Sequence, residues 1–140
     1  MAKSYSMKVK FESAVLHPLF QALSNEHIRW ENACFADGAS TLTKNNYERD
    51  MVYLNNLILG FEWCFNEGKD VELLLNSRDI GYIVEALENE MILLNEPSPS
   101  NFDLENWSLI NNLRDQIKNQ AIDNFGKNFL DSIHYDRSKK

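Results

Sequence analysis

The sequence predicts a mainly α-helical single domain of four helices, residues 1–140. A short two-stranded β element, in which about residues 5–11 pair with about residues 70–75, can accompany the helices. Four long segments carry apolar residues at steps of three and four, the period of a helix buried on one face. One N-terminal segment instead alternates with a period of two. A length of 140 residues with 44% hydrophobic residues is typical of one domain with one core.

The alternating segment covers residues 5–15, and we expect a strand as far as about Phe11. Pro18 suits the first turn of a helix, because no N–H is needed there. A helix from about Pro18 to Cys34 is predicted by the apolar steps that follow, at Leu16, Phe20, Leu23, His27, Trp30 and Cys34.

The second helix is expected to begin with Thr43 as its N-cap and to stop near Gly68. Its apolar stripe consists of Tyr47, Met51, Leu54, Ile58, Phe61 and Phe65. The run from Asp70 to Leu75 suits either a strand or a helix start. We favour a strand, since it gives the N-terminal strand a partner.

Asn76 or Ser77 can cap the third helix, whose buried stripe is Ile80, Ile83, Val84, Leu87, Met91 and Leu94. Its opposite face is expected to carry Glu85, Glu88 and Glu90.

Two prolines make residues 96–100 an internal linker. Ser100 with Asp103 resembles a capping box at the start of the last helix, whose stripe is Trp107, Ile110, Leu113, Ile117, Ala121 and Phe125. Gly126 predicts a kink or break there.

The charge distribution is the main functional indication. From Glu62 to Glu105 the sequence contains eleven carboxylates and only two cations, Lys69 and Arg78. The first ten residues carry a charge of +3, and residues 136–140, a frayed basic tail, carry +2. Since the net charge of the chain is −7, the residues between them carry −12. Such a middle repels the phosphate backbone, so we expect no direct contact with nucleic acid.

Several other classes lack their sequence signals. No apolar stretch is long enough for a membrane span, and Cys34 and Cys64 fit no zinc spacing, so the expectation is a cytoplasmic protein with reduced thiols. The glycines are scattered singly and the three histidines lie in no catalytic motif. We therefore expect no cofactor, no metal and no catalytic residues.

These observations favour a non-catalytic acidic binding protein that docks on a basic, nucleic-acid-handling protein and inhibits or sequesters it, as immunity proteins and phage anti-host proteins do. The residues expected to bind this partner are Glu85, Glu88, Glu90, Glu72, Trp63 and Tyr53. Trp63 and Tyr53 are included because they lie off the main stripe of the second helix. They form either a second packed face or an exposed apolar patch.

Two alternatives remain at this point. One is a small metal-dependent enzyme with an acid-rich site made of Glu67, Asp70, Glu85 and Glu88. The other is a self-associating structural module, in which Tyr53 and Trp63 cover one another across a two-fold axis.

Overall fold

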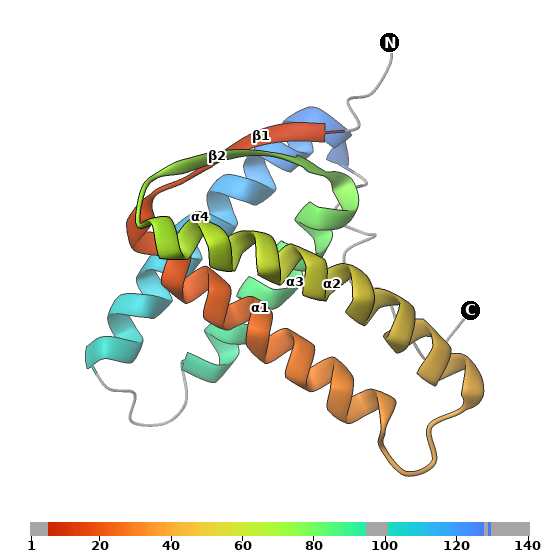
Figure 1. Ribbon diagram of the computed structural model, residues 1–140. Helices are drawn as coiled ribbons and strands as arrows, with labels where there is room; N and C mark the ends of the chain where they lie inside the picture. Colours follow the sequence, from red (N-terminus) through yellow and green to blue (C-terminus); the bar gives the residue numbers. More distant parts are fainter. Residues whose placement is uncertain (1–5, 95–100, 128, 130–140) are drawn as a thin grey trace.

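The computed structural model describes residues 6–94, 101–127 and 129. Its elements, in chain order, are β1 (Ser6–Phe11), α1 (Ser13–Cys34), α2 (Thr41–Glu67), β2 (Val71–Asn76), α3 (Ser77–Leu94) and α4 (Asn101–Phe125). Figure 1 shows the sheet lying across the helices, with α1 and α2 side by side. The prediction of a mainly α-helical fold with four helices and a short two-stranded sheet is confirmed.

The two strands pair antiparallel over their whole length, from Ser6 opposite Asn76 to Phe11 opposite Val71. Side chains alternate between the faces of a strand, so the period of two decides which residues point inward. Met7, Val9 and Phe11 are buried, while Lys8 and Lys10 are exposed. The alternation in the sequence therefore marked both the strand and its buried face.

Helix α1 begins at Ser13, earlier than the predicted start at Pro18. The backbone N–H of Ser13 donates to Asp70 Oδ1 at 2.8 Å, so the turn before β2 caps this helix from a distant part of the chain. Pro18 consequently lies inside the helix and is buried. The error arose because the capping group is far away in the sequence.

Helix α2 begins at Thr41, because the Ser40 side chain accepts a hydrogen bond from the Thr43 N–H at 3.1 Å. Ser40, and not Thr43, is therefore the N-cap. The helix ends at Glu67, and Gly68 follows with φ of 67°, a left-handed conformation that favours glycine. The predicted end near Gly68 is confirmed.

The start of α3 is a reciprocal cap between Asn76 and Asp79. Asn76 Oδ1 accepts from the Asp79 N–H at 2.8 Å, and Asp79 Oδ2 accepts from the Asn76 N–H at 3.0 Å. Helix α4 ends at Phe125, and Gly126 has φ of 96°, as the predicted break requires. The linker 96–100, the cap at Ser100, the Asp103 side chain and the tail 136–140 lie outside the described residues.

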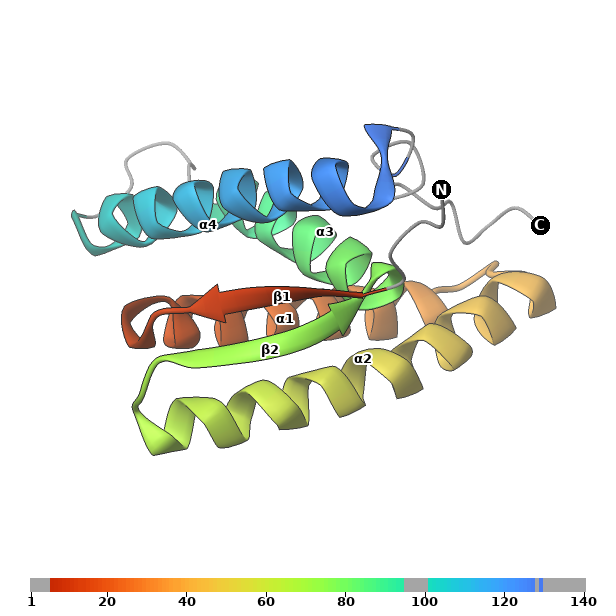
Figure 2. The same ribbon diagram turned by 90° about the horizontal axis from the view of Figure 1, so that it is seen from above.

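Helix α1 contacts each of the other helices, whereas α2 packs extensively only on α1. Seen from above in Figure 2, α2 flanks the sheet along its β2 edge, and α3 and α4 flank it along its β1 edge. An edge-to-face contact of Phe11 and Phe61, with ring centroids 5.2 Å apart, joins β1 to α2. The fully buried core around them includes Leu16, Leu19, Leu23, Leu54, Ile80, Ile83, Leu87, Ile110 and Ile117.

Candidate functional site

The third helix does not present an acidic face to solvent, contrary to the sequence prediction. Glu90 is only 2% exposed. Helix α3 packs against both α1 and α4, so its buried surface is wider than one apolar stripe and includes a carboxylate. The expectation that Glu90 lies on the exposed face is therefore wrong.

Glu90 belongs to a crossed pair of contacts between α1 and α3. Asn25 Nδ2 donates to Glu90 Oε1 at 2.9 Å, and Asn89 Nδ2 donates to the two oxygens of Glu26 at 3.0 and 3.1 Å. Glu26 is 1% exposed and also accepts from Arg29 Nε at 2.7 Å. Buried carboxylates need such partners, so this network has a structural role.

Glu88 and Glu85 are half-buried on the same helix. Glu88 lies 4.0 Å from Arg114 Nη1 and 3.9 Å from Lys118 Nζ, both on α4. These long ion pairs place its charge beside two cations of α4. The acidic residues of α3 are thus poorly placed to form a docking face.

Tyr53 packs against the start of α3, which is the first of the two arrangements expected for it. Its hydroxyl donates to Asp79 Oδ1 at 2.6 Å and accepts from Asn76 Nδ2 at 3.0 Å. The Arg78 guanidinium lies 4.1 Å from the centre of the Tyr53 ring. The Tyr82 ring packs edge to face against the Tyr53 ring, with ring centroids 5.5 Å apart.

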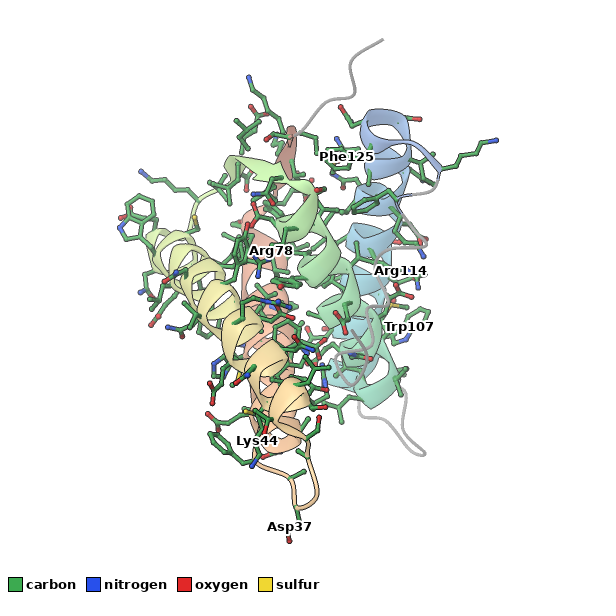
Figure 3. All side chains as sticks on the ribbon, turned by 90° about the vertical axis from the view of Figure 1, so that its right-hand side faces the viewer. Asp37, Lys44, Arg78, Trp107, Arg114 and Phe125 are labelled. Atoms are coloured by element: carbon green, nitrogen blue, oxygen red, sulfur yellow. The ribbon has the colours of Figure 1, made fainter. Side chains whose placement is uncertain are left out.

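Arg78 connects this cluster to α2 a second time. Its Nη2 donates to the buried Asp50 at 3.2 Å, and its Nε donates to Tyr82 Oη at 3.0 Å. Figure 3 shows Arg78 between α2 and α3. Burial raises the pKa of Tyr53, and the hydrogen bond to Asp79 raises it further. The cluster therefore fastens α2 to the β2–α3 junction.

Trp63 takes the second arrangement and lies 66% exposed near the C-terminal end of α2. Glu62 and Glu67 are exposed on the same helix end, and Glu72 is exposed on β2, where its register partner is Lys10. We call Glu62, Trp63, Glu67 and Glu72 the Trp63 surface. On these two elements carboxylates of the acidic segment and an aromatic side chain are both exposed to solvent.

A hollow of about 250 Å³ adjoins this surface. Its lining combines the Trp63 ring with one lysine and two carboxylates, from Trp63, Cys64, Glu67, Lys69, Asp70 and Val71. Burial raises the pKa of the Cys64 thiol, so this cysteine stays protonated and a poor nucleophile near neutral pH.

Helix α2 also carries an exposed apolar line that the sequence reasoning did not single out. Val52, Leu59 and Trp63 are 66%, 52% and 66% exposed and follow one another at steps of seven and four. With Asn56 they form what we call the outer stripe of α2, directly opposite the stripe that packs on α1. The helical spacing could have revealed it, because two opposite apolar lines exceed what one-sided packing requires.

The acid-rich metal site considered as an alternative does not assemble. Within residues 6–94, 101–127 and 129, no three His, Cys, Asp or Glu side chains are grouped so that they could hold a metal ion. A second hollow, about 320 Å³ between β1 and α4, is lined by Lys10, Glu12, Val15, Leu109, Asn112, Leu113 and Gln116. Its lining contains no pairing of nucleophile and base.

Comparison with protein-family models, with curated proteins and with solved structures finds no match for this chain. Among the helices of the described residues, none has the length and apolar character needed to cross a membrane.

Proposed function

We propose that this protein is a non-catalytic binding protein whose Trp63 surface docks on a basic surface of another protein and inhibits or sequesters it. One observation carries the proposal: Trp63 is two-thirds exposed and has exposed carboxylates on both neighbouring elements. Tryptophan is the residue type most typical of an interface hot spot, and an indole in solvent is stabilised when a partner covers it.

The charges around Trp63 indicate the kind of partner. Glu62, Glu67 and Glu72 outnumber the two cations beside them, Lys69 and Lys10, and the whole chain has a net charge of −7. Rim carboxylates of this kind accelerate association with a basic protein and contribute less to the final affinity. A groove that normally holds nucleic acid is basic, so an acidic inhibitor can compete for it, as immunity proteins and phage anti-host proteins do.

A charge-reversal experiment tests this proposal. The triple variant E62K/E67K/E72K is compared with E31K/D37K/E105K, which changes the net charge equally at exposed positions elsewhere. Figure 3 shows Asp37 in the α1–α2 loop, at the other end of α2. Protein captured from the native host by the wild type should be lost with the first variant and retained with the control.

A third variant, Trp63→Ala, separates the aromatic anchor from the charges. We expect it to speed dissociation of the captured partner, whereas the charge reversal slows association and makes it less dependent on salt. Capture that survives E62K/E67K/E72K with the fold intact would overturn the proposal. Equal loss with both triple variants would assign binding to net charge alone and would equally overturn it.

A further inference from the structure

The outer stripe of α2 points to an occupant that the chain itself can provide. We propose that α2 pairs antiparallel with α2 of a second copy of this chain, through Val52, Leu59 and Trp63. The inference goes beyond the docking of another protein, because it concerns the chain alone. The packing of α2 supports it: this helix packs extensively only on α1, so its opposite side is open along its length.

The two halves of α2 differ in charge, and this selects the occupant. The N-terminal half exposes Lys44 and Arg49 with Glu48, and Arg49 Nε also lies 3.3 Å from Oδ1 of the buried Asp50. The C-terminal half exposes Glu62 and Glu67 without any cation. In an antiparallel pair the cationic half of each copy faces the anionic half of the other copy, so the favourable contact is made twice. A parallel pair would instead place like charges together, which costs stability.

One register places apolar contacts at the centre of the pair and opposite charges toward its ends. If the midpoint of the pair lies between Asn55 and Asn56, Val52 is level with Leu59 of the partner subunit. Arg49 and Glu67 share one flank of α2, and Lys44 and Glu62 share the other, because each pair is eighteen residues, or five turns, apart. Same-flank positions meet in an antiparallel pair, so this midpoint brings Arg49 toward Glu67 of the partner subunit and Lys44 toward Glu62 of the partner subunit, each about 8 Å apart along the helix axis. In this register Trp63 is level with Glu48 of the partner subunit, and Asn55 and Asn56 lie at the midpoint.

The expected dimer is weak. A helix of 27 residues is about 40 Å long, and a single helix pair of that length buries less than a standard interface of about 1,600 Å². The corresponding dissociation constant is on the order of 10 μM. Since Trp63 also belongs to the Trp63 surface, the dimer would cover Trp63 and prevent another protein from binding it. This last consequence alone rests on the proposed function.

Light scattering and sedimentation velocity of the full chain, over concentrations that span this value, test the dimer. The wild type should change from monomer to dimer, and Leu59→Glu should remain monomeric. Ile92→Glu is the matched control, because Ile92 is an exposed apolar residue, 73% exposed, on α3. A wild type that stays monomeric, or a dimer that Ile92→Glu disrupts and Leu59→Glu does not, would overturn the proposal.

Mixing two charge variants tests the antiparallel halves. K44E/R49E has two anionic halves and E62K/E67K has two cationic halves, so each should dimerise at least about tenfold more weakly than the wild type. Their equimolar mixture should form a heterodimer at least as tight as the wild-type dimer. A mixture no tighter than the separate variants, with circular dichroism unchanged, contradicts charge pairing between copies.

Thiol crosslinking with a short bifunctional reagent determines the orientation. In the antiparallel pair two Asn56→Cys residues lie near the axis, whereas two Asn45→Cys residues are separated by roughly 30 Å along the helices. The native Cys34 and Cys64 are buried, and the wild type gives the background. Crosslinking at position 56 and not at 45 is expected, and the reverse result rules the arrangement out.

The two proposals fail separately. Leu59→Glu leaves Glu62, Trp63, Glu67 and Glu72 in place, so it should abolish the dimer and keep or strengthen capture of another protein. If the dimer forms but no charge reversal affects capture, only the proposed function is lost. If capture depends on the Trp63 surface and the wild type is monomeric, only the dimer is lost.

Discussion

Asn89 on α3 donates both of its short contacts to Glu26 on α1, at 3.0 and 3.1 Å, while the residues next to them, Glu90 and Asn25, make the same contact in the opposite direction. Each helix therefore contributes one amide and one carboxylate. A shift of α3 along α1 would separate both pairs at once and leave two buried carboxylates without these donors. The crossed pairs accordingly fix how α1 and α3 align.

Asn89→Ala should lower the free energy of unfolding by about 1–3 kcal/mol, because Glu26 loses an amide donor in a buried position. Urea unfolding followed by circular dichroism measures the change. Asn119→Ala, at an exposed position of α4, is the matched control and should be within about 0.5 kcal/mol of the wild type. Equal effects of the two substitutions would show that the Asn89 contact contributes little.

Replacement of Arg78 by lysine should destabilise the folded protein. Its guanidinium contacts the Tyr53 ring, Asp50 and Tyr82 Oη simultaneously, and an ammonium cannot reproduce the planar stacking with the two donors. We expect Arg78→Lys to cost about 1–2 kcal/mol of unfolding free energy. Lys69→Arg provides the converse exchange at an exposed site and should be neutral. A neutral Arg78→Lys would mean that the guanidinium contacts add nothing to the attachment of α2 beyond its other contacts.

Stability should fall above about pH 10. Burial raises the pKa of both Tyr53 and Tyr82 above the ordinary value of 10.0, and the hydrogen bond to Asp79 adds to the increase at Tyr53. In this range the folded state binds more protons than the unfolded state, so the stabilisation present below pH 10 is lost as the pH rises through the folded pKa values. Thermal melts from pH 8 to 11 measure the decline.

Tyr53→Phe removes one of these two groups, so its melting temperature should decline less steeply over the same range. Tyr47→Phe is the control, since Tyr47 is a partly buried tyrosine of the same helix outside the cluster. Identical pH profiles for the wild type and Tyr53→Phe would contradict the assignment of the alkaline loss to Tyr53.

Two aromatic residues of α2 should differ sharply when truncated. Phe61 is 1% exposed and packs on Phe11, so Phe61→Ala should cost about 3–5 kcal/mol. Trp63→Ala, at a 66% exposed position two residues later, should change the unfolding free energy by less than about 0.5 kcal/mol. Chemical denaturation of both variants decides whether Trp63 is retained for folding or for contact with another molecule.

The fold could be predicted because its signals are local. The alternation of Met7, Val9 and Phe11 marks β1, and the helical spacing marks each helix. The start of α1 was missed because its cap, Asp70, lies in the turn before β2. Burial of Glu90 was missed for a related reason. A carboxylate is expected to face solvent unless a buried hydrogen-bond donor is known, and the donor to Glu90 is Asn25 on another helix.

Less of the candidate site could be predicted. Trp63 takes one of the two arrangements expected for it, and Glu72 is exposed. Glu88 and Glu90 instead contact neighbouring helices, Glu85 is half-buried, and Tyr53 belongs to the Arg78 cluster. A single sequence gives the face of a helix but not how many neighbours the helix has. Because α3 lies between two helices and α2 beside one, the surface that we propose for binding lies on α2 and not on α3.

The pairing of β1 with β2 has a consequence for the order of folding. The strands bracket the α1–α2 hairpin, so Met7 meets Leu75 only after both intervening helices have been spanned. Closing so long a loop is entropically costly, whereas α1 and α2 are neighbours along the chain and can associate early. The sheet is therefore expected to form late, as the closure of a helical hairpin that has already assembled.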